Sequence, residues 1–302
     1  MTKRRVIVLG APLDLGASKQ GASGGPAAIR RAGLISSLDK IGLSVEDRGD
    51  VLVPEPSPYK NRKLKNAPAI LKVCRDLEKN VRKAARGGHF PLTLGGDHSL
   101  AMGTVSGVSG AYRKKGNSIG LLWVDAHADI NTPKTSPSGN IHGMPVAHLI
   151  GMGHAPFVRL GGFAPKVNPK NVCLVGTRTV DESEADNLRE SGVKVFSMQD
   201  IDRMGMARVM EQALSIVLGE TAGFHLSFDI DAVDPIQAPG TGTTQRGGLT
   251  YRESHLIMEM ASESKKLLGL DMVEVNPLED IQNSTAVLAV ELISSAMGKR
   301  IY

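Results

Sequence analysis

The chain has 302 residues, enough to bury a substantial core, and its 41% apolar and 22% charged residues are typical of a soluble globular protein. Its 36 Lys and Arg against 31 Asp and Glu leave a formal charge of +5, which is too small to indicate a nucleic-acid-binding protein. No apolar stretch approaches the ~18 residues that a membrane helix requires, so we expect no membrane span.

Two cysteines, Cys74 and Cys173, are too few for a disulfide framework or a zinc signature. Both lie in apolar contexts and are expected to be buried, reduced thiols. The apolar run near the N-terminus ends after five residues in Gly-Ala-Pro, which is too short for a signal-peptide core. One basic cluster, YKNRKLKN at 59–66, is predicted to be a solvated surface loop. We therefore expect a soluble, cytoplasmic protein with no nucleic-acid or membrane partner.

Short β-branched runs alternate with longer amphipathic or alanine-rich stretches along the chain. In chain order the patterns predict strand 5–10, helix 26–38, helix 67–86, strand 90–96, helix 99–115, strand 118–125, strand 171–177, helix 182–191, strand 193–197, helix 199–218, strand 223–231, helix 250–263, strand 267–275 and helix 284–297. Several strand runs are apolar at consecutive positions, as expected for strands that helices cover on both faces. The pattern predicts an α/β fold: one domain over residues 1–302, with a central parallel sheet and helices on both of its faces.

In such folds functional residues collect at the carboxyl ends of the strands, and three of these ends carry candidate ligands. Asp97-His98 follows a Gly-Gly turn, the segment DAHAD spans 125–129, and Asp229 and Asp231 end a third strand. In an extended backbone, side chains at i and i+2 leave the same face with their roots about 6.5 to 7 Å apart. We therefore expect the alternate positions of each segment to converge on one pocket.

Four carboxylates gathered in one pocket repel one another and lose hydration unless cations compensate them. A single D-x-D is more often a solvated turn, and a single Asp-His after Gly-Gly could be a helix cap, but three such segments together favour a metal site. Six ligands are too many for one tetrahedral ion and suit two divalent ions roughly 3.5 to 4 Å apart. The set has four carboxylates, two imidazoles and no thiolate, which favours Mn²⁺ over structural Zn²⁺. The predicted ligands are His98, Asp125, His127, Asp129, Asp229 and Asp231.

These motifs resemble the ureohydrolase family over nearly the whole chain, and within it the arginases most closely. The similar segments include GGDHSLAMG, WVDAHADINTP, SFDIDAVDP, GGLTYRE and DMVEVNP, while SGNIHGMP is similar to arginases more than to agmatinases. The resemblance implies a single α/β domain with two Mn²⁺ per chain and assembly into homo-oligomers, trimers or hexamers. It assigns one ion to His98, Asp125, Asp129 and Asp229 and the other to His127, Asp125, Asp229 and Asp231, with Asp125 and Asp229 bridging.

The resemblance also implies a reaction, the hydrolysis of L-arginine to L-ornithine and urea by a metal-bridging hydroxide. A guanidinium carbon is a poor electrophile, so a strong nucleophile is needed near neutral pH, where free hydroxide is scarce. Asp129 is placed to accept or relay the proton of that nucleophile. His142 resembles the family's proton-shuttle histidine, the alternative being a histidine that only hydrogen-bonds within its Gly-rich loop. Glu274 resembles the glutamate that holds the guanidinium group, the alternative being a salt bridge to a neighbouring Arg.

Further residues match positions that contact the rest of the substrate in arginases. Asn131, Ser138 and Asp181 match residues that read the α-carboxylate and α-amino groups, Thr243 lines the same pocket, and Glu184 is retained near Asp181. The chain departs from the usual pattern in two places. Thr244-Gln245-Arg246 replaces a proline-containing loop, and Thr179 stands where some arginases have a carboxylate. These departures bear on substrate affinity and specificity and leave the metal chemistry intact.

Two alternatives remain. One is a guanidine hydrolase acting on agmatine or guanidinobutyrate; Asn131 and Ser138 argue against it, because a decarboxylated substrate has no α-carboxylate for them to recognise. A non-catalytic relative would have lost a metal ligand, His142 or Glu274, and all are present. The remaining histidines, at 89, 148, 154, 225 and 255, are given no role, and Trp123 is predicted to pack in the core behind the metal site.

Overall fold

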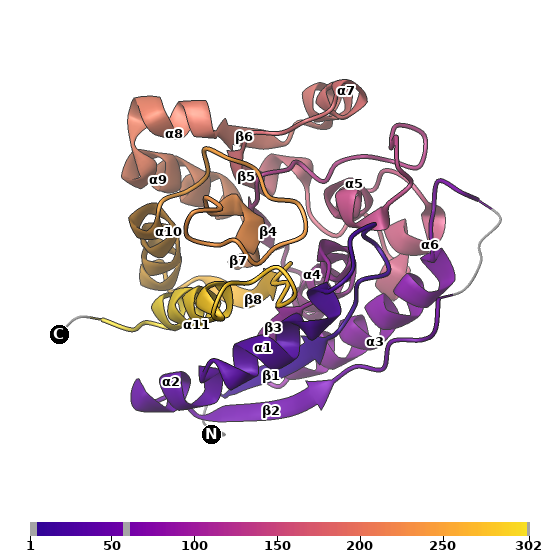
Figure 1. The fold of residues 1–302 in the computed structure, drawn as a ribbon. Helices are drawn as coiled ribbons and strands as arrows, with labels where there is room; N and C mark the ends of the chain where they lie inside the picture. The colour runs from indigo at the N-terminus through magenta and orange to yellow at the C-terminus, as the bar shows by residue number, and fades with distance from the viewer. Residues whose placement is uncertain (1–4, 57–60, 301–302) are drawn as a thin grey trace.

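The computed structural model describes residues 5–56 and 61–300. In this part of the chain, eight parallel strands form one sheet in the order β2-β1-β3-β8-β7-β4-β5-β6 (Figure 1). The strands are β1 Val6–Ala11, β2 Val45–Asp50, β3 Phe90–Gly95, β4 Gly120–Val124, β5 Val172–Thr177, β6 Lys194–Ser197, β7 Phe224–Asp229 and β8 Leu267–Val273. Every residue of the six inner strands is buried, as the consecutive apolar positions predicted. The edge strand β2 is largely exposed, and the edge strand β6 is partly buried.

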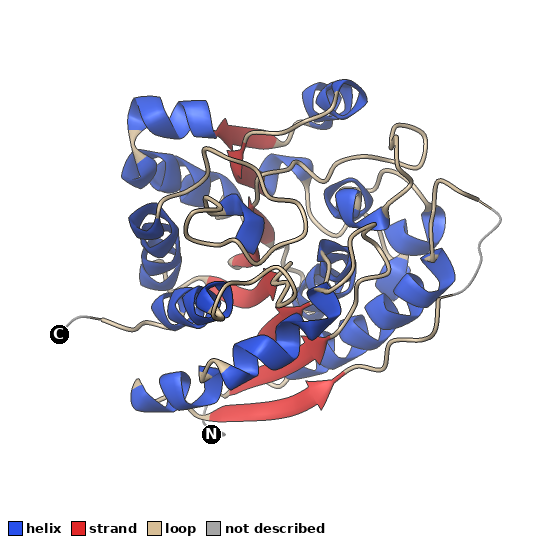
Figure 2. Ribbon diagram, in the orientation of Figure 1, coloured by secondary structure: helices blue, strands red, loops and turns tan. Residues whose placement is uncertain are grey.

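Helices cover both faces of the sheet (Figure 2). They are α1 Gly25–Arg31, α2 Leu34–Lys40, α3 Ala67–Arg86, α4 Ala101–Arg113, α5 Pro145–Leu149, α6 Ala155–Val158, α7 Glu182–Ser191, α8 Met198–Met204, α9 Met206–Val217, α10 Tyr251–Glu263 and α11 Ser284–Ala296. Alternate residues of β4 enter the two cores: Leu122 and Val124 pack with α1, α9, α10 and α11, and Leu121 and Trp123 pack with α3, α4 and α5. The fold is therefore the predicted α/β sandwich in a single domain.

Three local features differ from the sequence prediction. Strand β2 was not predicted because its sequence, VEDRGD, is polar, which an edge strand tolerates. The single helices predicted at 26–38 and 199–218 are each two helices, because Gly33 (φ 95°) and Gly205 (φ 77°) adopt left-handed backbone conformations that interrupt them. The short helices α5 and α6 were also not predicted, since neither is long enough to show a helical period.

Cys74 and Cys173 are both buried and unpaired, as expected. Within residues 5–56 and 61–300, none of the helices combines the length and the apolar composition needed to cross a bilayer.

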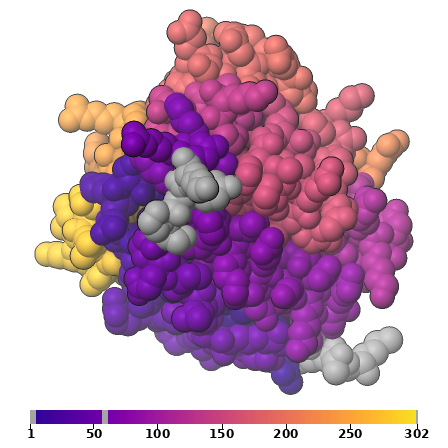
Figure 3. Space-filling view, turned by 90° about the vertical axis from the view of Figure 1, so that its right-hand side faces the viewer, coloured from indigo at the N-terminus to yellow at the C-terminus, as the bar shows by residue number. Residues whose placement is uncertain are grey.

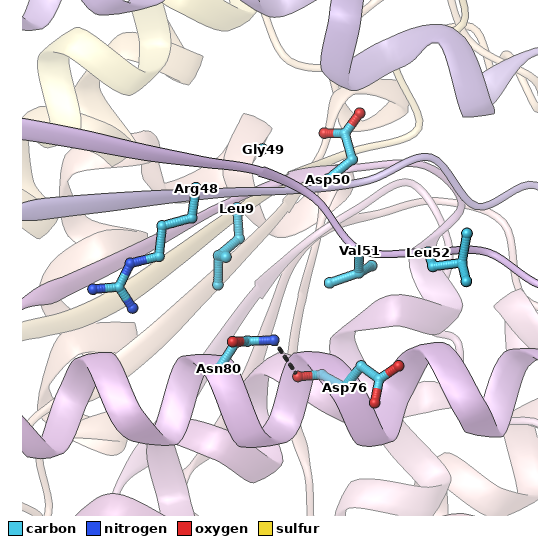
Figure 4. Close-up of a pocket in the computed structure, with 8 residues that line it drawn as sticks. All are labelled: Leu9, Arg48, Gly49, Asp50, Val51, Leu52, Asp76 and Asn80. Carbon is cyan, nitrogen blue, oxygen red and sulfur yellow. Dashed lines mark hydrogen bonds between the residues drawn. The ribbon is translucent and has the colours of Figure 1, made fainter.

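A pocket of about 210 Å³ opens between β2 and α3 at the edge of the sheet (Figure 4). Its polar side chains are already bonded locally: Asp50 accepts from Arg30, Asp76 pairs with Lys72, and Asn80 Nδ2 donates to the Asp76 carbonyl at 2.9 Å. None of the predicted site residues lines it. The candidate site lies elsewhere, at the carboxyl ends of the inner strands.

Candidate metal centre and active site

The predicted metal ligands and Glu274 follow four strands that are neighbours in the sheet, β3, β8, β7 and β4. His98 follows β3, Glu274 follows β8, Asp229 ends β7, and Asp125 follows β4. Because all four strands are parallel, their carboxyl ends meet at the same edge, so residues up to 176 positions apart come into contact. The order of the strands in the sheet thus brings together site residues that lie far apart in the sequence.

The ring nitrogen Nδ1 of His98 faces three carboxylates. It lies 3.1 Å from Asp125 Oδ2, 3.1 Å from Asp229 Oδ2 and 3.4 Å from Asp129 Oδ2, yet it is buried and makes no hydrogen bond to any described residue. The ring is stacked on Trp123, with the two centroids 3.8 Å apart, which places Trp123 behind the site as predicted. One nitrogen surrounded by three carboxylate oxygens, without a hydrogen bond, is the geometry of ligands that converge on a cation.

The other ring nitrogen has a partner that can orient the ring. His98 Nε2 lies 2.9 Å from Ser227 Oγ, and the Ser227 hydroxyl donates to Asp271 Oδ2 at 3.4 Å. In this arrangement Ser227 accepts from His98 Nε2–H, which makes Nδ1 the ring atom that would ligate a metal ion. Burial lowers the pKa of His98, but Asp125 and the other carboxylates nearby raise it above its ordinary value, so the position at Nδ1 favours a cation, either a proton or a metal ion.

Asp271 is itself held by two further donors. Thr104 Oγ1 donates to Asp271 Oδ2 at 2.5 Å, and His225 Nε2 lies 2.9 Å from the same oxygen. These residues were not predicted to belong to the site. A signal was available for two of them: Asp271 interrupts an apolar strand, and Ser227 lies two positions before Asp229, on the same face of β7.

A second group of ligands surrounds His127. Its Nδ1 lies 3.1 Å from Asp231 Oδ2 and 3.4 Å from Asp125 Oδ1. Asp125 therefore presents Oδ2 to His98 and Oδ1 to His127, as a bridging carboxylate would. Asp229 Oδ2 faces His98, while Asp229 Oδ1 accepts the backbone N–H of Asp231 at 2.8 Å.

Two sets of side chains among the described residues could each hold a metal ion. His98, Asp125 and Asp229 form one, Asp125, His127 and Asp231 form the other, and within each set the ligand atoms lie within 4.8 Å of one another. Asp129 belongs to neither set, although it lies beside the first through its contact with His98.

The electrostatics of the cluster also favour bound cations. The pKa of Asp229 is raised by burial and by the charge of Asp231. The pKa of Asp129 is raised by burial and by the charge of Asp125. Burial lowers the pKa of His127, but Asp231 and Asp125 more than reverse this and raise that pKa to about 12. Without metal, the protein would therefore compensate its carboxylates with bound protons, which divalent ions can replace.

The backbone at the site differs from the extended chain that the spacing predicted. Asp125 directly follows β4, and His127 forms an isolated parallel bridge with Thr179, with a bend at Ala126 between them. Asp129 is left-handed (φ 49°), and Asp231 lies in the 3-10 turn Ile230–Ala232. The prediction that alternate residues share one extended face is therefore wrong for Asp129 and Asp231. Local turns aim these two side chains, and Asp tolerates the left-handed region better than most residues.

His142 and Glu274 form a buried pair beside the first ligand group. His142 Nδ1 lies 3.1 Å from Glu274 Oε1, which also accepts the backbone N–H of His98 at 2.8 Å. Burial lowers the pKa of His142, but the hydrogen bond and the charge of Glu274 raise it above its ordinary value. Glu274 is 2% exposed and adopts φ 63°, a strained conformation for a residue other than Gly. Among the described residues, the ion-pair partner of Glu274 is His142. The alternative prediction for Glu274 was a salt bridge to a neighbouring Arg.

Three of the predicted substrate-binding residues form one cluster. Asn131 Nδ2 donates to Asp181 Oδ2 at 2.9 Å, and Asp181 begins α7 by accepting the backbone N–H of Glu184 at 2.9 Å. Glu184 Oε1 accepts the backbone N–H of Ile130 at 2.9 Å, and burial raises the pKa of this carboxyl to about 7. The cluster therefore holds polar groups next to the ligand-bearing segment 125–129.

Thr243 and Ser138 lie apart from that cluster. Thr243 Oγ1 donates to Asp231 Oδ2 at 2.9 Å, so it contacts the second ligand group directly. Ser138 is exposed, and its Oγ accepts the backbone N–H of Asn140 at 3.1 Å.

Arg178 was not predicted to belong to the site, yet it cross-links the loops around it. It donates to the backbone carbonyls of Asp231 and Gln245, at 2.8 Å each, and to that of Ala232 at 3.0 Å. It therefore anchors the loop that departs from the usual family pattern, while Arg246 in the same loop is exposed.

Comparison with known proteins identifies the family. The model of the arginase family matches residues 4–298. This chain belongs to the arginase family. The arginase of Bacillus caldovelox is 43% identical over 299 residues, 98% of this chain and 99% of that protein, and the arginase of Bacillus subtilis (strain 168) is 45% identical over 298 residues, 99% of each. The enzyme class follows from this membership: the chain is a hydrolase of the arginase family.

Solved structures agree with this assignment. The native structure of the Bacillus caldovelox arginase at pH 5.6 superimposes with a TM-score of 0.95 at 42% identity, covering 99% of this chain and 100% of that one. A hypothetical agmatinase from Burkholderia thailandensis is less similar, with a TM-score of 0.74 and 28% identity over 97% of this chain and 84% of that one.

Proposed function

We propose that this chain hydrolyses L-arginine to L-ornithine and urea and that it uses two Mn²⁺ ions per chain. The observation that carries the proposal is that His98 Nδ1 faces three carboxylate oxygens at 3.1 to 3.4 Å, with Asp125 shared between two ligand groups. A hard donor set of carboxylates and imidazoles without thiolate supports Mn²⁺. The chain's greater similarity to arginases than to the agmatinase supports arginine over its decarboxylated analogue.

In this proposal six side chains hold the metals. One ion would be held by His98, Asp125, Asp129 and Asp229 and the other by His127, Asp125, Asp229 and Asp231. Divalent ions bound here would lower the pKa of a water so that it is nucleophilic near neutral pH.

The protein's own groups would bind the substrate and move the protons. The buried carboxylate of Glu274 would hold the guanidinium cation, which supplies the positive charge that this carboxylate needs in a buried site. Asp129 would accept the proton that the attacking water releases. His142, whose pKa Glu274 raises, would donate a proton to the departing ornithine nitrogen.

The α-amino-acid end of arginine would meet a different set of groups. We propose that Asn131, Ser138, Asp181 and Glu184 bind its α-carboxylate and α-amino groups. Thr243 would line the pocket beside the second ligand group. By analogy with the family, we also propose that the chain forms a cytoplasmic homo-oligomer, a trimer or a hexamer.

The decisive experiment is urea release from L-arginine after incubation with Mn²⁺, with agmatine and guanidinobutyrate measured in parallel under the same conditions. We expect arginine to be strongly preferred. Preference for agmatine would retain the metal chemistry and reject the roles of Asn131, Ser138 and Asp181. No urea from any of the three substrates would reject the proposed activity.

A further inference from the structure

The basic cluster predicted to be a solvated loop makes specific contacts with the loop that carries Ser138. Lys63 Nζ donates to the backbone carbonyl of Ser136 at 2.6 Å and to that of Pro137 at 3.3 Å. Lys65 Nζ donates to Asn140 Oδ1 at 3.0 Å. Residues 59 and 60 of the cluster lie outside the described residues. Of the rest, Lys63 and Lys65 are exposed, Leu64 is buried, and the segment contacts the loop that carries Ser138.

The backbones of the two loops are also in contact. The N–H of Lys65 donates to the carbonyl of Gly139 at 3.2 Å. A Cβ on Gly139 would lie 2.4 Å from the Arg62 carbonyl oxygen, and Gly139 has φ 75°, so only glycine fits this approach. Gly139 N–H in turn donates to Ser136 Oγ at 2.9 Å. The conformation of the loop around Ser138 therefore depends on the segment 61–66.

The same contacts extend to a third segment, residues 15–18. Asn140 Nδ2 donates to Ser18 Oγ at 2.9 Å, and Asn66 Nδ2 donates to the Leu15 carbonyl at 3.0 Å. The backbone N–H of His142 donates to the Gly16 carbonyl at 3.2 Å. Figure 3 views the side of the molecule where purple atoms of the early chain adjoin magenta atoms of its middle.

The two ammonium groups keep their charge uncompensated at this place. Their acceptors are carbonyl and amide oxygens, and in the part of the chain that the structure describes neither Lys63 nor Lys65 forms an ion pair with a carboxylate. Two positive charges therefore flank the exposed Ser138. In the proposed function, Ser138 helps to recognise the α-carboxylate of the substrate. Charges placed beside a ligand group favour the ligand of opposite sign.

We propose that Lys63 and Lys65 determine specificity for substrates that carry an α-carboxylate. They fix the conformation of the Ser136–Asn140 loop and add positive charge beside Ser138. This charge attracts the α-carboxylate of arginine and disfavours a ligand that has a cation or an uncharged group in place of that carboxylate. The inference rests on the proposed function, since it concerns the same substrate.

The test compares Lys63→Met and Lys65→Met with Lys63→Arg, which keeps the charge and the donors. Lys83→Met, which removes an exposed lysine from α3, is the matched control. We would measure KM and kcat for L-arginine, and the binding of L-ornithine and of putrescine by calorimetry, since putrescine is ornithine without its carboxylate. Metal content and Tm of each variant would be recorded alongside.

In each Met variant we expect KM for arginine and Kd for ornithine to rise about fivefold, with kcat changed less than about twofold, which is the effect of one partly exposed charge. Binding of putrescine should not weaken, and Lys63→Arg and Lys83→Met should resemble the wild type. Equal weakening of ornithine and putrescine, or unchanged ornithine binding, would overturn the inference. Failure of the proposed function is a separate result, the absence of urea release by the wild type, and the calorimetry still tests the two lysines in that case.

Discussion

Replacing Ser227 by Ala tests the tautomer of His98, on which the metal assignment depends. The change removes the acceptor of His98 Nε2–H, which lies 2.9 Å from the hydroxyl in a fully buried environment. A buried N–H without an acceptor is costly, so the imidazole would move its proton to Nδ1, where three carboxylates face it. A proton on Nδ1 competes with the metal for the same position.

The loss should resemble that of other partners that orient metal-ligating histidines, about 10- to 100-fold in metal affinity. This corresponds to about 1.4 to 2.7 kcal/mol, since each tenfold change in a dissociation constant is 1.4 kcal/mol. The affinity of the variant should also depend more steeply on pH than that of the wild type, because metal binding must displace the additional proton.

The assay is titration of the metal-free protein with Mn²⁺, with free Mn²⁺ followed by electron paramagnetic resonance. Ser227→Thr keeps the hydroxyl and should retain most of the affinity. Ser106→Ala is the matched control, because Ser106 is equally buried in α4 and its hydroxyl has no partner among the described residues. If Ser227→Ala binds Mn²⁺ as tightly as the wild type and keeps its Tm, the assigned tautomer is wrong.

Three further changes address the remaining groups. His142→Ala should lower kcat by about 10²- to 10³-fold near neutral pH, the usual contribution of a general acid, and leave the Mn²⁺ content unchanged; loss of metal would instead make His142 structural. Asp231→Ala should cost one Mn²⁺ per chain by elemental analysis and most of the activity, and an unchanged stoichiometry would contradict its assignment as a ligand. Burial lowers the pKa of His148 from 6.5 to about 4. Between these pH values the unfolded chain binds a proton at His148 that the folded chain does not bind. The free energy of unfolding is therefore unaffected by the titration of this residue above pH 6.5 and falls by up to about 3 kcal/mol as the pH drops to 4. Urea unfolding at pH 7.5 and pH 5 should show this loss in the wild type and a smaller one in His148→Gln.

The parts of the fold that sequence reasoning predicted are those with a local signal. The inner strands are apolar at successive positions, and α3 and α10 show helical periodicity, so the position of each could be predicted from a short window. Strand β2 has no such signal, because an edge strand is polar on its exposed side and is stabilised by its pairing with β1. The breaks at Gly33 and Gly205 depend on backbone conformations that packing selects.

The site residues also divide into those with a local signal in the sequence and those without one. The alternate spacing of Asp125 and His127 placed both at the end of β4, and their side chains do converge as predicted. The spacing did not predict that Asp129 is left-handed or that Asp231 lies in a turn, because both conformations are stabilised by contacts with other segments. Asp229, for example, aims Asp231 by accepting its backbone N–H.

By itself, the sequence determined the α/β class, the strand ends that carry ligands and the hard donor set that favours divalent ions, since each depends on residue type and short spacing. Only the tertiary structure decided that β3, β8, β7 and β4 are neighbours, which brings His98 and Glu274 together across 176 positions. It also decided the contact of His98 with Ser227 and the contact of Lys63 with the loop of Ser138. The physical reason is the same in each case: these contacts join segments far apart in the chain, and their energies depend on the packing of the whole sheet and its loops rather than on any local pattern.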